Sequence, residues 1–196
     1  MQLAASTIVF LRHGETDWNV EGRLQGQRDV PLNDRGRSQA RRNGEVIANA
    51  IPAVAGFDFV ASPLGRACES MEIARSAMGL DPKAYRTDER LLEITFGDCE
   101  GFTYRDIERQ KPGRLAEREA NKWDFLPPGG ESYQMLSDRI VAWLQGIDQP
   151  TVVVAHGGVG RVARAHLLGL DKATSVAEDF PHDKVFLWKE GKGVWL

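Results

Sequence analysis

The chain has 196 residues, of which 42% are hydrophobic and 27% are charged. This composition is that of a globular protein with a sizeable core, and it excludes a disordered chain. The formal net charge of −3 shows none of the basic excess that nucleic-acid binders carry. No apolar run approaches the roughly 20 residues that a membrane-spanning helix needs.

Cysteine usage and the N-terminal sequence indicate where the protein works. The chain holds two cysteines, Cys68 and Cys99, which are too few for a disulfide framework. The N-terminal residues lack the basic and apolar regions of a secretory signal peptide. We therefore expect a cytoplasmic protein without a nucleic-acid or membrane partner, present as a monomer or a small homo-oligomer.

The first half of the chain alternates short apolar strands with amphipathic helices. Residues 7–11 (TIVFL) are apolar and β-branched, as expected for a buried strand of a parallel sheet. A polar loop with several glycines follows over residues 19–31, and a helix begins near Asn33, which is a good N-cap residue. Residues 57–61 predict a second strand, and the Ser-Pro pair at 62–63 predicts the start of the next helix.

The middle of the chain gives weaker signals. Residues 90–94 indicate a short strand, and residues 103–110 indicate a short helix. Residues 111–126 show no clear pattern, so the sequence leaves open whether they form a lid. Four basic residues in this stretch occur at helical spacing, which is more typical of a solvated face than of a substrate-attracting one: Lys111, Arg114, Arg118 and Lys122.

The last third returns to clear periodicity. Residues 133–144 predict an amphipathic helix, residues 151–155 (TVVVA) a buried strand, and residues 159–167 another helix. Residues 185–188 and 194–196 suggest a terminal β-hairpin. Because strands alternate with helices, we expect an α/β protein that forms a single domain over the whole chain, residues 1–196.

Two of the predicted strands run directly into a His-Gly pair. The first strand is followed by Arg12, His13 and Gly14, and the strand at 151–155 is followed by His156 and Gly157. Ligands of open α/β sheets bind at the carboxyl ends of the strands, so the two imidazoles can meet at one sheet edge. Glycine after each histidine lets a ligand approach the backbone closely.

Two arginines are expected at the same edge. Arg12 ends the first strand, and Arg66 lies in the first turn of the helix that follows the second strand. Helical side chains lean toward the helix N-terminus, so Arg66 can reach back over the sheet. Two arginines, two histidines and helix N-termini form a pocket for a dianion, and phosphate fits it best.

Such a pocket can transfer a phosphoryl group. A neutral imidazole can act as the nucleophile, and Glu93, at the end of its predicted strand, can protonate the leaving oxygen. The arginines supply the positive charge that a metal ion supplies elsewhere. A metal site is the competing use of two histidines, but it needs more ligands and would suffer repulsion from the arginines. We therefore expect no metal and no cofactor.

At these residues the chain resembles the histidine phosphatase superfamily, which includes the cofactor-dependent phosphoglycerate mutases. The resemblance covers nearly the whole chain. Its motifs occur in order at residues 12–16 (RHGET) with Asn19, at 24–32, 62–67, 92–101 and 129–132, and at 156–158 (HGG).

The resemblance implies a three-layer sandwich, with helices on both faces of a mostly parallel central sheet, as in phosphoglycerate mutase. It also implies a role for each site residue. His13 would carry the phosphoryl group, Glu93 would donate the proton, and Arg12, Arg66 and His156 would bind the phosphoryl oxygens. Four further residues would contact the substrate: Asn19, Gln25, Gly26 and Gly157. Cys99 departs from the aromatic residue, usually tryptophan, that the family often has there, which affects the shape of the pocket.

The resulting hypothesis is a metal-independent phosphatase that hydrolyses a small phosphomonoester through phosphohistidine on His13. The alternative is a phosphoglycerate mutase, but only 62 residues separate Glu93 from His156, and the resemblance associates mutases with a longer insertion there. A catalytically inactive interaction protein is a third hypothesis, which the intact site residues disfavour. His182 stays open between a solvated loop residue and a neighbour of the pocket.

Overall fold

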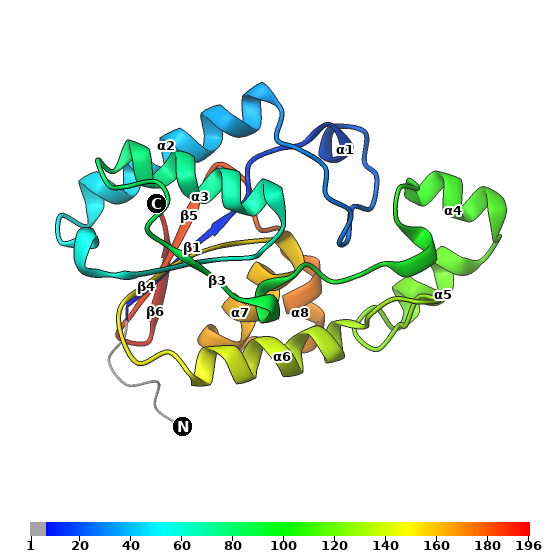
Figure 1. The fold of residues 1–196 in the computed structure, drawn as a ribbon. Coiled ribbons are helices and arrows are strands. Elements are labelled where there is room, and N and C mark those ends of the chain that lie inside the picture. The colour runs from blue at the N-terminus through cyan, green and yellow to red at the C-terminus, as the bar shows by residue number, and fades with distance from the viewer. Residues whose placement is uncertain (1–6) are drawn as a thin grey trace.

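A six-stranded sheet forms the middle layer of the protein in the computed structural model, which describes residues 7–196 (Figure 1). The strand order is β3-β2-β4-β1-β5-β6. The pairs β1–β4, β2–β4 and β2–β3 are parallel, whereas β5 pairs antiparallel with β1 and with β6, so the predicted mostly parallel sheet is confirmed. The strands are β1 (Ile8–Arg12), β2 (Asp58–Ala61), β3 (Arg86–Thr87), β4 (Thr151–Ala155), β5 (Val185–Lys189) and β6 (Lys192–Trp195).

The central strands are buried from both sides. All five residues of β4 are buried, as are four of the five in β1, which explains their continuous apolar sequences. Helices α2 (Asp34–Ala50) and α3 (Gly65–Ala77) cover one face of the sheet. Helices α6 (Tyr133–Gln145), α7 (Gly157–Leu168) and α8 (Lys172–Ala177) lie on the other face, which completes the three-layer sandwich (Figure 1).

The remaining helices lie away from the two covering layers. Helix α1 (Asp17–Val20) follows β1 closely and overlaps the start of the loop predicted from the sequence. Helices α4 (Tyr104–Gln110) and α5 (Arg114–Ala120) form a lobe at one end of the molecule (Figure 1). This lobe contributes to one wall of the pocket that contains Arg12 and His13.

Several predicted elements are confirmed with small changes in their bounds. Helix α2 begins at Asp34, and the side chain of Asn33 caps it by accepting a hydrogen bond from the Gly36 backbone N–H. Helix α4, helix α6 and the terminal hairpin also lie where the sequence predicts them.

Other local predictions were wrong. Residues 90–94 do not form a strand, because the Asp88 carboxylate accepts from the Arg90 N–H and a 3-10 turn spans Glu89–Leu91. The third strand is instead the short pair Arg86–Thr87. Helix α3 begins at Gly65, not at the Ser-Pro pair. Helices α5 and α8 were not predicted.

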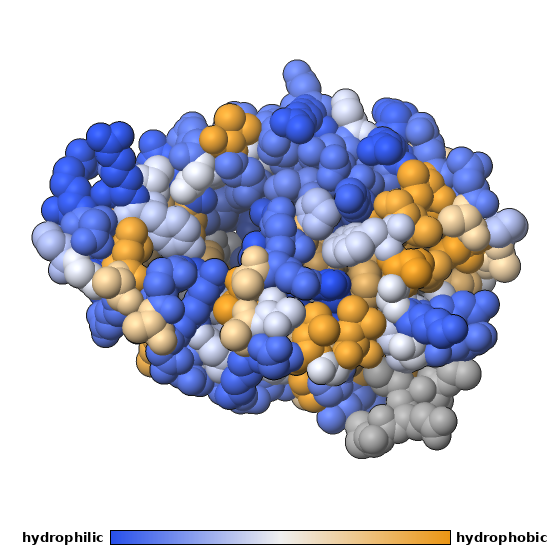
Figure 2. Space-filling view, turned by 180° about the vertical axis from the view of Figure 1, so that it is seen from behind, coloured by the Kyte–Doolittle hydropathy of each residue, from blue (hydrophilic) through white to orange (hydrophobic). Residues whose placement is uncertain are grey.

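The face of the molecule seen in Figure 2 is mainly hydrophilic. Figure 2 shows the face opposite to that of Figure 1, where hydrophobic residues form separate groups among the hydrophilic ones. Within residues 7–196, no helix is both long and apolar enough to cross a membrane. The N-terminal segment considered for a signal peptide lies partly outside the described residues, which exclude 1–6.

Candidate active site

The register of the sheet brings the two predicted histidines together. Arg12 of β1 pairs with Ala155 of β4, so the next residue of each strand, His13 and His156, emerges at the same level. Their ring centroids are 5.1 Å apart, and their exposed fractions are 3% and 0%. The prediction that two imidazoles meet at one sheet edge is therefore confirmed by the geometry.

Hydrogen bonds fix the tautomer of His13. Its Nδ1 lies 2.7 Å from the carbonyl oxygen of Gly14, which can only accept, so Nδ1 carries the proton. Its Nε2 accepts from Nε of Arg66 at 3.3 Å and therefore holds the lone pair. Burial, followed by the charge of Arg66, keeps the pKa of His13 well below its usual value. His13 is thus a neutral imidazole at neutral pH, with a nucleophilic nitrogen beside a guanidinium.

Arg66 is a buried cation that points into the same region. Its exposed fraction is 1%, and burial lowers its pKa. Its terminal nitrogens donate to the carbonyl oxygens of Arg28 (2.6 Å) and Gly26 (2.7 Å). Within residues 7–196, no carboxylate lies within ion-pair distance of Arg66, although Arg12 and Arg28 nearby do form ion pairs. Arg66 therefore makes no direct ion pair within these residues and can bind an anion.

Arg12 is a second cation at the site, and its side chain is 17% exposed. Burial, and next the charge of Arg161, lowers the pKa of Arg12 to about 10. One terminal nitrogen of Arg12 donates to the carbonyl oxygen of Phe180 at 2.9 Å and lies 3.8 Å from the exposed carboxylate of Asp179. The Nε atom of Arg12 is buried and has no hydrogen-bond partner in the described part of the chain. A Cβ on Gly157 would lie only 3.2 Å from the Arg12 guanidinium carbon, so glycine gives the guanidinium its space at the start of α7.

Glu93 reaches the site from a loop and not from a strand end. Its Oε2 accepts from the Gly158 N–H at 3.1 Å, and its Oε1 accepts from the Ile94 N–H at 2.9 Å. The predicted position beside the pocket is right, although the predicted strand is absent. Two backbone donors therefore orient the carboxyl group at the first turn of α7.

The site residues surround one pocket of about 310 Å³. Four of the five catalytic candidates line it: Arg12, His13, Arg66 and Glu93. The fifth, His156, is fully buried and lies next to this lining through its contact with the His13 ring. The four residues expected to contact substrate also line the pocket: Asn19, Gln25, Gly26 and Gly157.

Gly26 allows two loops to approach each other at the edge of the pocket. It has a φ of 52°, and a Cβ there would lie 1.9 Å from Oε1 of Glu100. Glu100 in turn accepts from the Gln27 and Phe96 N–H groups. This carboxylate therefore connects the loop that carries Gly26 with the loop that follows Glu93.

The sequence interpretation missed the far wall of the pocket. Tyr104, Arg118, Lys122, Tyr133 and Arg161 also line it. The Arg118 side chain is only 13% exposed, so it does not belong to a solvated face. Arg161 follows Gly157 by four residues in α7, and this spacing, which places both on one helix face, could have identified it.

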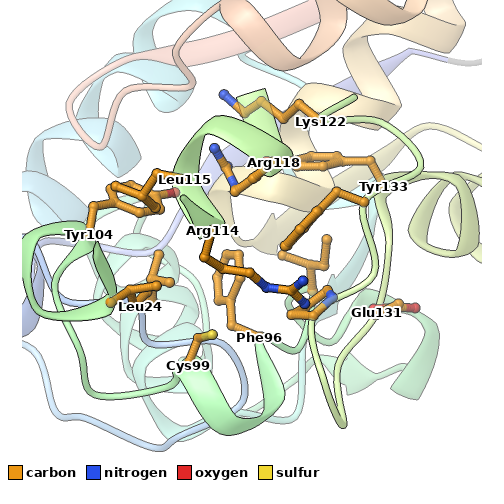
Figure 3. A pocket seen from close by; sticks show the side chains of 14 residues that line it. Leu24, Phe96, Cys99, Tyr104, Arg114, Leu115, Arg118, Lys122, Glu131 and Tyr133 are labelled. Carbon is orange, nitrogen blue, oxygen red and sulfur yellow. The ribbon is translucent and has the colours of Figure 1, made fainter. Parts of the chain in front are cut away.

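A small apolar cavity of about 30 Å³ adjoins this wall (Figure 3). In Figure 3 the charged ends of Arg118 and Lys122 lie on the same side of the cavity. Cys99 also lines the cavity, so the residue that departs from the family pattern helps to shape the space beside the pocket. The cavity shares six residues with the larger pocket: Leu24, Phe96, Tyr104, Arg118, Lys122 and Tyr133.

His182 is a neighbour of the nucleophile candidate. Its Nδ1 donates to the His13 carbonyl oxygen at 2.6 Å, and the two ring centroids are 5.4 Å apart. The Asn43 side chain donates to the His182 carbonyl oxygen, which fixes the loop. Burial, and next the charge of Arg12, lowers the pKa of His182 to about 4. The sequence left His182 open between a solvated loop residue and a neighbour of the pocket, and the structure favours the neighbour of the pocket.

Within residues 7–196, no group of three or more His, Cys, Asp or Glu side chains could hold a metal ion. The charged groups that face the pocket are mainly arginines, which suit an anionic ligand.

The geometry agrees with the result of a comparison with protein families. The model of the histidine phosphatase superfamily (branch 1) matches residues 8–185. The chain belongs to this superfamily. The resemblance inferred from the sequence motifs is thereby confirmed.

Similar proteins are phosphatases and mutases of this superfamily. A glucosyl-3-phosphoglycerate phosphatase of Mycobacterium tuberculosis is 38% identical over 185 residues, which cover 87% of this chain and 79% of that protein. A probable phosphoglycerate mutase, GpmB, of Salmonella paratyphi C is 34% identical over 155 residues, which cover 76% of this chain and 69% of that protein.

Solved structures give the same result. A mycobacterial glucosyl-3-phosphoglycerate phosphatase in complex with VO3 is 35% identical, with a TM-score of 0.78 over 98% of this chain and 96% of that one. Family, identity and fold together make this chain a phosphatase of the histidine phosphatase type, which acts on phosphomonoesters.

Proposed function

We propose that this superfamily member hydrolyses phosphomonoesters through a phosphohistidine on Nε2 of His13. The observation that carries the proposal is the state of this imidazole: Nδ1 is held by the Gly14 carbonyl, and the Nε2 lone pair lies beside Arg66. A buried neutral imidazole next to guanidinium groups can attack a phosphorus atom whose oxygens those groups bind.

The remaining site residues complete the reaction. Arg12, Arg66 and His156 bind the phosphoryl oxygens, and the two arginines neutralise their charge, so no metal ion is needed for this. Glu93 donates a proton to the leaving oxygen as the phosphorus–oxygen bond breaks, and then accepts a proton from the water that attacks phospho-His13. Asn19, Gln25, Gly26 and Gly157 contact the substrate, and residues 1–196 act as one catalytic domain.

The leaving group of the substrate carries a second negative charge in this proposal. Arg118 and Lys122 line the pocket beyond the phosphoryl site, and burial followed by the charge of Arg118 lowers the pKa of Lys122. Lys122 donates to the carbonyl oxygen of Val176 and has no carboxylate within ion-pair distance among residues 7–196. A carboxylate in the leaving group would relieve the repulsion between Lys122 and Arg118. Two relatives are glucosyl-3-phosphoglycerate phosphatases, and the phosphoglycerate part of that name supports a carboxylate in the substrate.

The alternative is phosphoryl transfer to a second hydroxyl, as in a mutase, which the similarity to GpmB favours. The identity of 38% to the mycobacterial phosphatase exceeds the 34% to GpmB, which favours hydrolysis. We also propose that the enzyme works in the cytoplasm, where the free thiols of Cys68 and Cys99 stay reduced, as a monomer or small homo-oligomer.

One screen tests the proposal. The protein is incubated with a panel of phosphorylated metabolites, and inorganic phosphate and isomerised phosphoglycerate are both measured. We expect phosphate release from wild type and none from His13→Ala. Isomerisation without phosphate release would favour the mutase, and equal phosphate release by both proteins would overturn the proposed nucleophile.

A further inference from the structure

Ser62 lies beside His156 because of the register of two neighbouring strands. Ala61 of β2 pairs with Val154 of β4, so Ser62 follows β2 close to the point where His156 follows β4. The Ser62 N–H donates to the Val154 carbonyl oxygen at 2.9 Å. Ser62 is fully buried, and its Oγ lies 2.7 Å from Nε2 of His156. None of the roles described above uses this hydroxyl group.

The direction of this hydrogen bond follows from the partners of each atom. The Ser62 Oγ accepts from the Leu64 N–H at 3.4 Å, and within residues 7–196 its own proton has one acceptor in reach, Nε2 of His156. A buried hydroxyl group that fails to donate loses a hydrogen bond. The Ser62 proton therefore lies on the Nε2 lone pair, and the proton of the neutral imidazole is on Nδ1.

The opposite tautomer is less favourable. With the proton on Nε2, the Ser62 hydroxyl would have to accept and its proton would have no acceptor in this part of the chain. Nδ1 of His156 would then be a buried lone pair, and this atom has no partner among the described residues. A lone pair would also repel a phosphoryl oxygen, whereas an N–H group would donate to it.

The two neighbouring imidazoles thus differ in hydrogen bonding: His13 presents a lone pair, and His156 presents an N–H donor. His13 donates through Nδ1 to Gly14 and leaves a lone pair on Nε2. His156 accepts at Nε2 and leaves an N–H group at Nδ1, which has no partner in residues 7–196. Burial keeps the pKa of His156 well below its usual value, so it is neutral and needs a defined tautomer in order to donate.

We propose that Ser62 is a positioning residue that sets the tautomer of His156, so that its Nδ1–H donates to an oxygen of the transferred phosphoryl group. The role rests on the proposed phosphatase function, since it concerns the same pocket. Ser62 itself does not touch the substrate. It acts through His156, and its removal leaves the nucleophile and both arginines in place.

The first test reads the tautomer directly and needs no variant of Ser62. Nitrogen-15 NMR of wild-type protein with labelled histidine distinguishes a protonated Nδ1 from a protonated Nε2, and the His156→Gln variant assigns the signal. We expect the Nδ1–H form of His156, with a change of its Nδ1 signal on addition of orthovanadate. An Nε2–H form would overturn the proposal, whether or not the enzyme is active.

The second test compares Ser62→Ala with Ser175→Ala. Ser175 is similarly buried, but its hydroxyl group has no partner within the described residues, so it controls for the loss of a buried oxygen. Removing one donor to developing charge costs about 10²–10³ in kcat, so a partial loss of the tautomer is expected to lower kcat roughly 10–100-fold. Inhibition by orthovanadate should weaken in parallel.

The controls separate the possible outcomes. Ser175→Ala should keep wild-type kcat and wild-type inhibition. A folded Ser62→Ala protein with wild-type kcat and wild-type inhibition would overturn the proposal. If His13→Ala were fully active, the proposed nucleophile would fail, while the NMR measurement would still decide the tautomer of His156.

Discussion

Replacing Glu93 by glutamine should slow the hydrolysis of alkyl phosphates far more than that of p-nitrophenyl phosphate. An alkoxide is strongly basic and needs a proton as it leaves, whereas nitrophenolate leaves without one. General acid catalysis is worth about 10²–10⁴-fold, so the alkyl substrate should lose about that factor.

The structure adds a second effect that both substrates share. The two oxygens of Glu93 accept from the Ile94 and Gly158 N–H groups, and glutamine can replace only one of these acceptors. The other N–H group then faces an NH₂ group, which costs about 1–3 kcal/mol of stability and disturbs the site. Glutamine at this position therefore does more than remove the transferable proton.

The ratio of the two substrates separates these effects. The assay measures kcat/KM for glycerol phosphate and for p-nitrophenyl phosphate with wild type and Glu93→Gln, alongside a urea unfolding curve for each protein. Misplacement of the site lowers both values together and cancels in the ratio. We expect the ratio to change by about 10² or more. An unchanged ratio would mean that Glu93 only positions the site, and would refute its role as the acid.

Three further predictions follow from the charges of the site. Excess EDTA should leave activity unchanged, because arginines supply the positive charge; a loss restored by a divalent metal would contradict this. Lys122→Met should raise KM for 3-phosphoglycerate about tenfold or more and change KM for glycerol phosphate little, since these substrates differ by the carboxylate. Equal changes in the two KM values would show that Lys122 does not bind the carboxylate. The folded pKa of His182, about 4, lies below its unfolded value, so protonation favours the unfolded state and stability falls as pH drops from about 6.5 toward 4. Between pH 7 and pH 4.5, the free energy of unfolding measured with urea should fall by about 2–3 kcal/mol less in His182→Asn than in wild type. An equal fall in both proteins would show that His182 does not titrate as inferred.

The sequence predicts the catalytic end of the sheet well, for a physical reason. Two buried strands that end in His-Gly pairs place their histidines at one edge once the strands are parallel, and β1 and β4 are neighbours. Arg66 depends only on its place in the first turn of a helix, which is a local property. Beyond the parallel pairing of β1 with β4, these features need no knowledge of how distant segments pack.

The wall of the pocket could not be predicted in the same way. Arg118 and Lys122 resemble a solvated stripe in sequence, because nothing local reveals that the segment around α5 packs against the pocket. The prediction of a strand around Glu93 was wrong because Asp88 caps a 3-10 helix just before this residue. Ser62 was interpreted from the sequence only as part of a helix start, yet its hydroxyl group bonds to His156, 94 residues away.

The most direct test of the account is to identify the phosphorylated residue. The enzyme is mixed with a substrate labelled in its phosphoryl group, quenched within milliseconds in alkali, and digested for mass spectrometry. The account predicts an acid-labile, alkali-stable phosphoryl group on His13, which forms and decays as fast as turnover. A phosphoryl group on a different residue, or normal turnover by His13→Ala, would contradict it.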